Sequence, residues 1–192
     1  MKKKIRITFN APLVLCFALL CTAVTIIRLA AGDGIDRVFS TYASSWRDPM
    51  TYVRLFTHVI GHVSFAHLLG NMSYILLLGP MLEEKYGWKN LLAVMLVTAA
   101  VTGLVHNLLF PRVYLLGASG IVFAFILQTS LTSVKEGEIP LTFILVAVIY
   151  LGQQIWDGIT VKDDISNLSH IIGGLVGGGA GWVLNFGKNK KI

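Results

Sequence analysis

Two histidines and an asparagine interrupt an apolar stretch of the sequence, HVSFAHLLGNM at residues 62–72. Imidazole and amide groups are costly to bury in an apolar environment unless other groups hold them there. His67 and Asn71 are four residues apart, so on a helix they share one face. Together they could donate hydrogen bonds to an oxyanion. His58 and His62 form a second pair with this spacing, and we expect both to lie nearer the surface and water.

A serine between glycines offers a possible nucleophile. Ser119 lies in GASG, residues 117–120, just before an apolar run. A serine in this position is often a helix N-cap. The flanking glycines also free the backbone, so that the Ser119 hydroxyl and N–H could point into a cavity. The motif alone is compatible with both roles.

A histidine near the end of the chain could supply a base. His170 precedes Gly173 and Gly177, and this glycine spacing lets helices approach closely. His170 lies on the same face. It is therefore either a structural hydrogen-bonding group between helices or a base within reach of Ser119.

The five histidines also raise the question of a metal. The segment HVIGH at 58–62 lacks the glutamate of the zinc-hydrolase pattern H-E-x-x-H. No acidic residue within the apolar stretches could complete such a site. The sequence therefore predicts neither a metal nor another cofactor.

Composition indicates a membrane protein. The 192 residues are 55% hydrophobic and 14% charged, with mean hydropathy +0.70, whereas soluble domains carry about 25% charged residues. Six stretches lack Lys, Arg, Asp and Glu, and each is near or above the length of a spanning helix. None of them shows the alternation of apolar and polar residues that is typical of β-barrel strands. A basic start also opens signal peptides, but the first stretch is longer than their apolar core. We expect one all-α domain, 1–192, with six spans at approximately 11–31, 58–82, 90–108, 116–134, 139–156 and 166–187.

The charges fit this topology. If the N-terminus is cytoplasmic, the whole basic excess of +6 falls on the inner side. The outer side then carries equal numbers of basic and acidic residues. This is the positive-inside distribution, so the net charge gives no reason to expect nucleic acid. It places both termini in the cytoplasm. The second, fourth and sixth spans then begin at the outer face, and His67, Asn71, Ser119 and His170 lie at similar depth.

The motifs HVSFAHLLGNM, GASG and HIIGGLVG, in this order, resemble those of rhomboid intramembrane serine proteases of the bacterial type. The resemblance implies a six-helix bundle with Ser119 as nucleophile, His170 as general base, and His67, Asn71 and the Ser119 N–H as oxyanion donors. It departs from the family at Val53, where bacterial members often have Trp before the arginine, and at Phe123, where several have Tyr. The residues expected to support the site are His62, Gly117, Phe123, Gly173, Gly177, Arg54 and Glu83.

The implied reaction is cleavage of single-span membrane proteins near the outer face of the bilayer. Two other classes stay open. A transporter would have polar groups along a continuous path, whereas here the inner halves of the spans are almost wholly apolar. A non-catalytic rhomboid-like protein that binds membrane clients would not need both Ser119 and His170. The compact chain, with no extra domain, favours a bacterial inner membrane, with the lipid bilayer and single-span substrates as partners.

Overall fold

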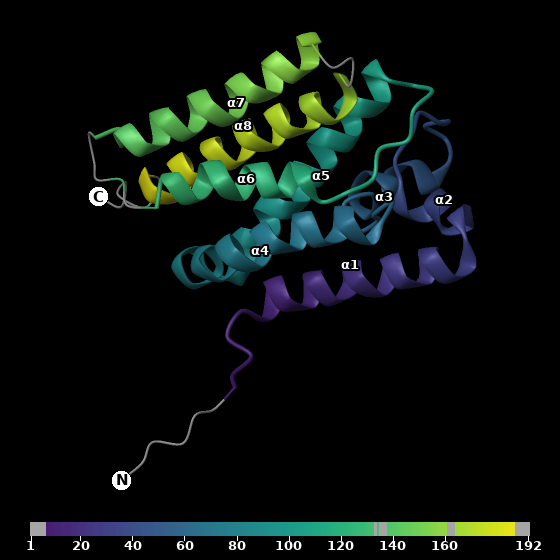
Figure 1. Cartoon of the computed structure of the whole chain (residues 1–192), viewed down its shortest axis with the longest axis horizontal. Helices are drawn as coiled ribbons and strands as arrows, with labels where there is room; N and C mark the ends of the chain where they lie inside the picture. The colour runs from purple at the N-terminus through teal and green to yellow at the C-terminus, as the bar shows by residue number, and fades with distance from the viewer. Residues whose placement is uncertain (1–6, 133, 135–137, 161–163, 187–192) are drawn as a thin grey trace.

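The chain folds into a bundle of helices (Figure 1). The computed structural model describes residues 7–132, 134, 138–160 and 164–186. These residues contain no β-strand, only an isolated bridge between Thr41 and Leu115. Their helices are α1 (Pro12–Ala31), the 3-10 helix η1 (Asp33–Ile35), α2 (Asp36–Phe39), α3 (Pro49–Thr57), α4 (Phe65–Tyr86), α5 (Trp88–Leu109), α6 (Ser119–Ser130), α7 (Leu141–Thr160) and α8 (Asp164–Phe186).

The predicted all-helical membrane bundle is confirmed. Among the described residues, α1, α4 and α5 are each long and apolar enough to cross a bilayer. Two shorter apolar stretches are α6 and the Leu141–Gln153 part of α7. Each predicted span overlaps one of the six long helices, while the number that cross the membrane stays a prediction.

The helix within the second predicted span, 58–82, begins later than residue 58. Residues 58–64 form turns and extended chain, and α4 begins at Phe65. Ser64 is the N-cap, with extended backbone and a side chain that accepts a hydrogen bond from the N–H of His67 at 3.1 Å. Apolar residues in the loop lengthened the charge-free stretch beyond the helix itself. At the other end, α4 continues to Tyr86 and stops at Gly87, whose φ of 80° favours glycine.

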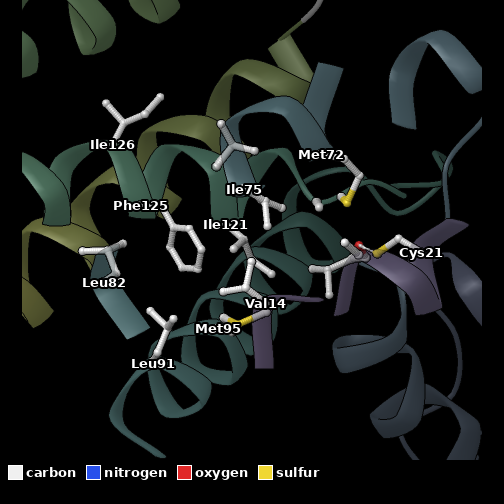
Figure 2. Close-up of a cluster of buried hydrophobic side chains, with 14 of the residues drawn as sticks. Val14, Cys21, Met72, Ile75, Leu82, Leu91, Met95, Ile121, Phe125 and Ile126 are labelled. Atoms are coloured by element: carbon white, nitrogen blue, oxygen red, sulfur yellow. Dashed lines mark hydrogen bonds between the residues drawn. The ribbon is translucent and has the colours of Figure 1, made fainter. Parts of the chain in front are cut away.

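The helix within the fourth predicted span is also shorter than the predicted range. The expected range was 116–134, whereas α6 covers Ser119–Ser130. This helix lies at the centre of the bundle and contacts α4, α5, α7 and α8. Ile121 and Phe125 of α6 are completely buried. Figure 2 shows Phe125 and Ile121 among side chains from α1, α4 and α5, including Val14, Ile75 and Met95.

Glycines bring α8 unusually close to α6. A side-chain carbon at Gly173 would lie 2.1 Å from the carbonyl oxygen of Gly120, and one at Gly177 would lie 2.0 Å from that of Ala124. Any larger residue would force the helices apart, so the two backbones are in direct contact. α4, α6 and α8 all begin toward the same side of the bundle, on the right in Figure 1.

Candidate active site

A cavity of about 560 Å³ lies where α6 begins, and it is lined by residues from α4, α6 and α8 together with the segments at 63 and 113–116. His67 and Asn71 reach it from α4, Ser119 and Phe123 from α6, and His170 from α8. Residues about 50 positions apart in sequence thus meet at one cavity. This is the geometric precondition for a shared site.

Ser119 is the first residue of α6. Ala118 occupies the N-cap position, and no side chain caps the helix. Gly117 precedes them with φ 133°, a conformation that residues with side chains rarely adopt. A side-chain carbon at Gly117 would lie 2.6 Å from Cε1 and 2.9 Å from Nε2 of His67. Gly117 therefore allows the turn that presents Ser119 and leaves room for the His67 ring.

His67 and Asn71 have polar atoms without protein partners. The Nδ1 atom of His67 and the Nδ2 atom of Asn71 are buried and have no hydrogen-bond partner among the described residues. A buried donor left unpaired costs on the order of 1–3 kcal/mol. The same Nδ2 atom lies 3.7 Å from the position that a side chain on Gly117 would occupy. The amide is thus a free donor beside the turn that leads into Ser119.

The His170 ring is oriented by aromatic packing. It stacks on Phe123 with ring centroids 4.3 Å apart and planes 7° from parallel. Phe123 in turn meets Tyr150 of α7 edge to face at 5.9 Å. The carbonyl oxygen of Ser169 lies 3.6 Å from the position that a side chain on Gly120 would take. The turn of α8 that carries His170 therefore abuts the turn of α6 that carries Ser119.

His62 is completely buried, so the expectation that it lies near water is wrong. Its Nδ1 atom lies 3.1 Å from the Ile60 carbonyl, which can only accept, so this nitrogen carries the proton. Nε2 then accepts from the N–H of Ala118 at 3.4 Å. Burial lowers the pKa of His62 to about 4, which keeps the imidazole neutral at pH 7. The His62 ring therefore fixes the backbone of Ala118, the residue before Ser119.

His58 is equally buried and also differs from expectation. Its Nδ1 atom donates to the Arg54 carbonyl at 3.1 Å, and its own carbonyl accepts from the N–H of Gly117 at 2.9 Å. Burial lowers the pKa of His58 to about 4. Because residues 58–64 fold inward instead of extending α4 outward, His58 and His62 both bond to the 117–118 backbone, a role that periodicity alone could not reveal.

Of the seven predicted supporting residues, all within the described part of the chain, Phe123 is the one that lines the cavity. Arg54 and Glu83 make their contacts elsewhere. Arg54 is buried; its Nε donates to the Arg37 carbonyl at 2.8 Å, and its guanidinium lies 4.6 Å from the centre of the Tyr42 ring. It holds the first long connection together. The Glu83 carboxylate accepts from the backbone N–H groups of Leu13 and Val14, each at 3.0 Å. It caps the first turn of α1 from α4.

The end of α5 supplies supporting residues to which the sequence analysis gave no role, although His106 is one of the five histidines considered there. The Nε2–H of His106 donates to the Val113 carbonyl at 2.8 Å, and the Asn107 side chain accepts from the Thr41 hydroxyl at 3.1 Å. Thr41 and Leu115 exchange two backbone hydrogen bonds of 2.9 Å. These bonds fix the segment 113–116 that lines the cavity. The sequence pattern that could have indicated this supporting role is the presence of polar residues in the last turn of an apolar helix.

Within the described part of the chain, no three His, Cys, Asp or Glu side chains are grouped to hold a metal ion. Besides the phenol groups of Tyr74 and Tyr114, the polar side chains that line the cavity are the Ser119 hydroxyl, two imidazoles and the Asn71 amide. A hydroxyl beside an imidazole is suited to nucleophilic attack, and amide and imidazole N–H groups are suited to binding a developing negative charge.

Comparison with known proteins identifies the family. The sequence profile described as Rhomboid domain matches residues 49–185, most of the chain from the start of α3 to the last turn of α8. No curated protein matches the chain. The matched region contains every residue lining the cavity, and apolar helices surround it. The chain therefore belongs to the rhomboid family of intramembrane proteins.

Proposed function

We propose that the chain is an intramembrane serine endopeptidase that cleaves single-span membrane proteins near the outer face of the bilayer. The observation that carries the proposal is the single cavity lined by Ser119, His170, His67 and Asn71. It provides a nucleophile, a base and two hydrogen-bond donors, the minimum set for acyl transfer.

In the proposed reaction, Ser119 Oγ attacks the peptide carbonyl while His170 takes its proton. The imidazolium then protonates the leaving amine, and a water molecule activated by the same base releases the acyl group. None of the described residues that line the cavity carries a carboxylate. Stacking on Phe123 helps to orient His170, and the Phe123 ring replaces the Tyr of several family members without its hydroxyl.

The oxyanion is stabilised by His67, Asn71 and the N–H of Ser119. The Nδ2 atom of Asn71 supports this role, because a donor with no partner among the described residues is available to the transition state. Each such donor contributes about 2.7–4 kcal/mol to transition-state binding in serine proteases. The substrate must be locally unwound, because the peptide bonds of a helix are shielded by the turns around them.

We also propose an inner-membrane location in a bacterium, with both termini in the cytoplasm and the cavity toward the outer face. The charge distribution of the sequence supports this orientation. Many of the basic residues in that argument, Lys2, Lys3, Lys4, Arg6, Lys135, Lys188, Lys190 and Lys191, lie outside the described residues.

The test uses the purified chain reconstituted with a single-span reporter protein. We expect Ser119→Ala to abolish cleavage and fluorophosphonate labelling, and His170→Ala to block the labelling of Ser119. Ser130→Ala is the matched control, because this serine closes the same helix and its hydroxyl donates to the Leu127 carbonyl, away from the cavity. Cleavage that survives Ser119→Ala would contradict the proposal. A wild-type chain that binds the reporter but is never labelled would favour the non-catalytic binder.

A further inference from the structure

A salt bridge outside the cavity is connected to it by a short series of contacts. At the outer end of α1, the Nε and Nη2 atoms of Arg28 donate to the two carboxylate oxygens of Asp36 at 2.8 and 2.9 Å. The third nitrogen, Nη1, donates to the carbonyl of Val63 at 2.7 Å. The two charged side chains are only 19% and 20% exposed. A bidentate, partly buried pair of this kind fixes geometry better than a fully exposed one.

The bond to Val63 connects this pair to the loop 58–64. Val63 lines the cavity beside His67. Its neighbour His62 bonds to the N–H of Ala118, and the His58 carbonyl bonds to the N–H of Gly117. Contacts that hold the loop 58–64 in place therefore also hold the backbone at 117–118, directly before Ser119.

α2 supports the same loop from outside. A side-chain carbon at Gly61 would lie 2.2 Å from the carbonyl oxygen of Phe39, the last residue of α2, so the two backbones touch. Asp36, the first residue of α2, is the partner of Arg28. The loop is thus held between α2 on one side and the 117–118 backbone on the other, and Arg28 is the side chain that joins α1, α2 and the loop.

We propose that Arg28 is a positioning residue, which sets the place of Ser119 and its N–H through the loop 58–64. The inference rests on the proposed function, because it assigns Arg28 a part in presenting the nucleophile. Arg28 does not touch the reacting groups. Its removal would leave the Val63 carbonyl and the Asp36 carboxylate without their donors and would free the loop to shift. Displacement of about 1 Å at a reacting atom can cost on the order of a hundredfold in rate.

The experiment compares Arg28→Ala with Arg47→Ala in proteoliposomes. Arg47 is an exposed arginine of the same outer region, and its side chain has no partner among the described residues. We expect Arg28→Ala to slow both Ser119 labelling by a fluorophosphonate and kcat by about tenfold or more, with KM changed by less than about threefold. Arg47→Ala should behave as wild type. Arg28→Lys should fall between them, because one ammonium cannot serve both Asp36 and Val63.

Two further measurements separate positioning from a general loss of stability. Labelling rates are normalised to the folded fraction by circular dichroism. Amide hydrogen exchange should accelerate at Gly117 and Ala118 in Arg28→Ala, while exchange at the inner end of the bundle stays unchanged. In a His62→Ala background, Arg28→Ala should have a smaller effect, because the route through His62 is already broken.

If Arg28→Ala does not fold, Asp36→Asn replaces it, with an expected slowing of a few fold, since the amide keeps only part of the bidentate pair. Labelling unchanged in the folded variants, with an active wild type, would overturn this inference and leave the proposed function intact. A drop in the labelling rate that is explained wholly by the unfolded fraction would also overturn the positioning role of Arg28. A wild-type chain that is neither labelled nor active would overturn both.

Discussion

At Gly117 the candidate site leaves no room for a side chain next to the His67 ring. There the absence of a side chain matters as much as the presence of the polar groups. A single methyl group at 117 would overlap two atoms of the imidazole, and the φ of 133° would disfavour it independently.

We therefore expect Gly117→Ala to reduce fluorophosphonate labelling of Ser119 by about a hundredfold or more, since both His67 and the Ser119 turn must move. Labelling is compared with Gly152→Ala, because Gly152 of α7 has open space where a side chain would go. Wild-type labelling in a folded Gly117→Ala protein would show that the turn tolerates a side chain and that His67 is free to rotate.

At the scale of the helix, the approach of α8 to α6 sets the position of His170. Gly173 and Gly177 lie one turn apart and face the α6 backbone, whereas Gly179 on the same helix has nothing within 4 Å of its missing side chain. The helix α8 therefore contains both tightly packed glycines and, in Gly179, an unpacked glycine that serves as a control.

We predict that Gly177→Ala destabilises the protein by about 1–3 kcal/mol through overpacking. It should also lower kcat, because α8 is pushed away from Ser119. Gly179→Ala should leave unfolding unchanged or raise stability by up to about 1 kcal/mol, since alanine is the better helix former. Thermal unfolding in detergent, followed by cleavage assays on the same samples, measures both effects. Equal stability of the two variants would rule out close packing at Gly177.

The helix contact could be anticipated from the sequence because it depends on local spacing. The repeat of Gly173 and Gly177, and the i,i+4 pair of His67 and Asn71, are properties of single helices. The fold of the loop 58–64 could not be anticipated in this way. His62 has the same apolar surroundings in sequence as a helical residue, and its burial depends on contacts with residue 118 and with α2, far along the chain. Long-range backbone contacts leave no periodic signal.

For the whole molecule, burial of His58 and His62 makes the fold sensitive to acid. Both lie in the loop between α3 and α4, and burial lowers the pKa of each to about 4, against about 6.5 when exposed. Between these values the unfolded chain binds protons that the folded chain does not. The free energy of unfolding must therefore fall as the pH falls from about 6.5 to about 4, and it is insensitive to these groups above pH 6.5.

We expect the melting temperature in detergent to drop between pH 7 and pH 5, with each histidine contributing on the order of 1–2 kcal/mol at pH 5. His58→Gln should weaken the pH dependence, because glutamine can keep a hydrogen bond without titrating. Unfolding is followed by circular dichroism across the pH range. A pH dependence unchanged in His58→Gln and in His62→Gln would show that neither imidazole is protonated on unfolding.

The cap on α1 has a consequence for how the protein is made. The N–H groups of Leu13 and Val14 find their acceptor in Glu83, 70 and 69 residues later in the chain. A ribosome delivers the first helix long before that carboxylate exists. Until α4 is synthesised, these two N–H groups need another acceptor, such as water. The docking of α1 against Glu83 is thus completed only after α4 has been made.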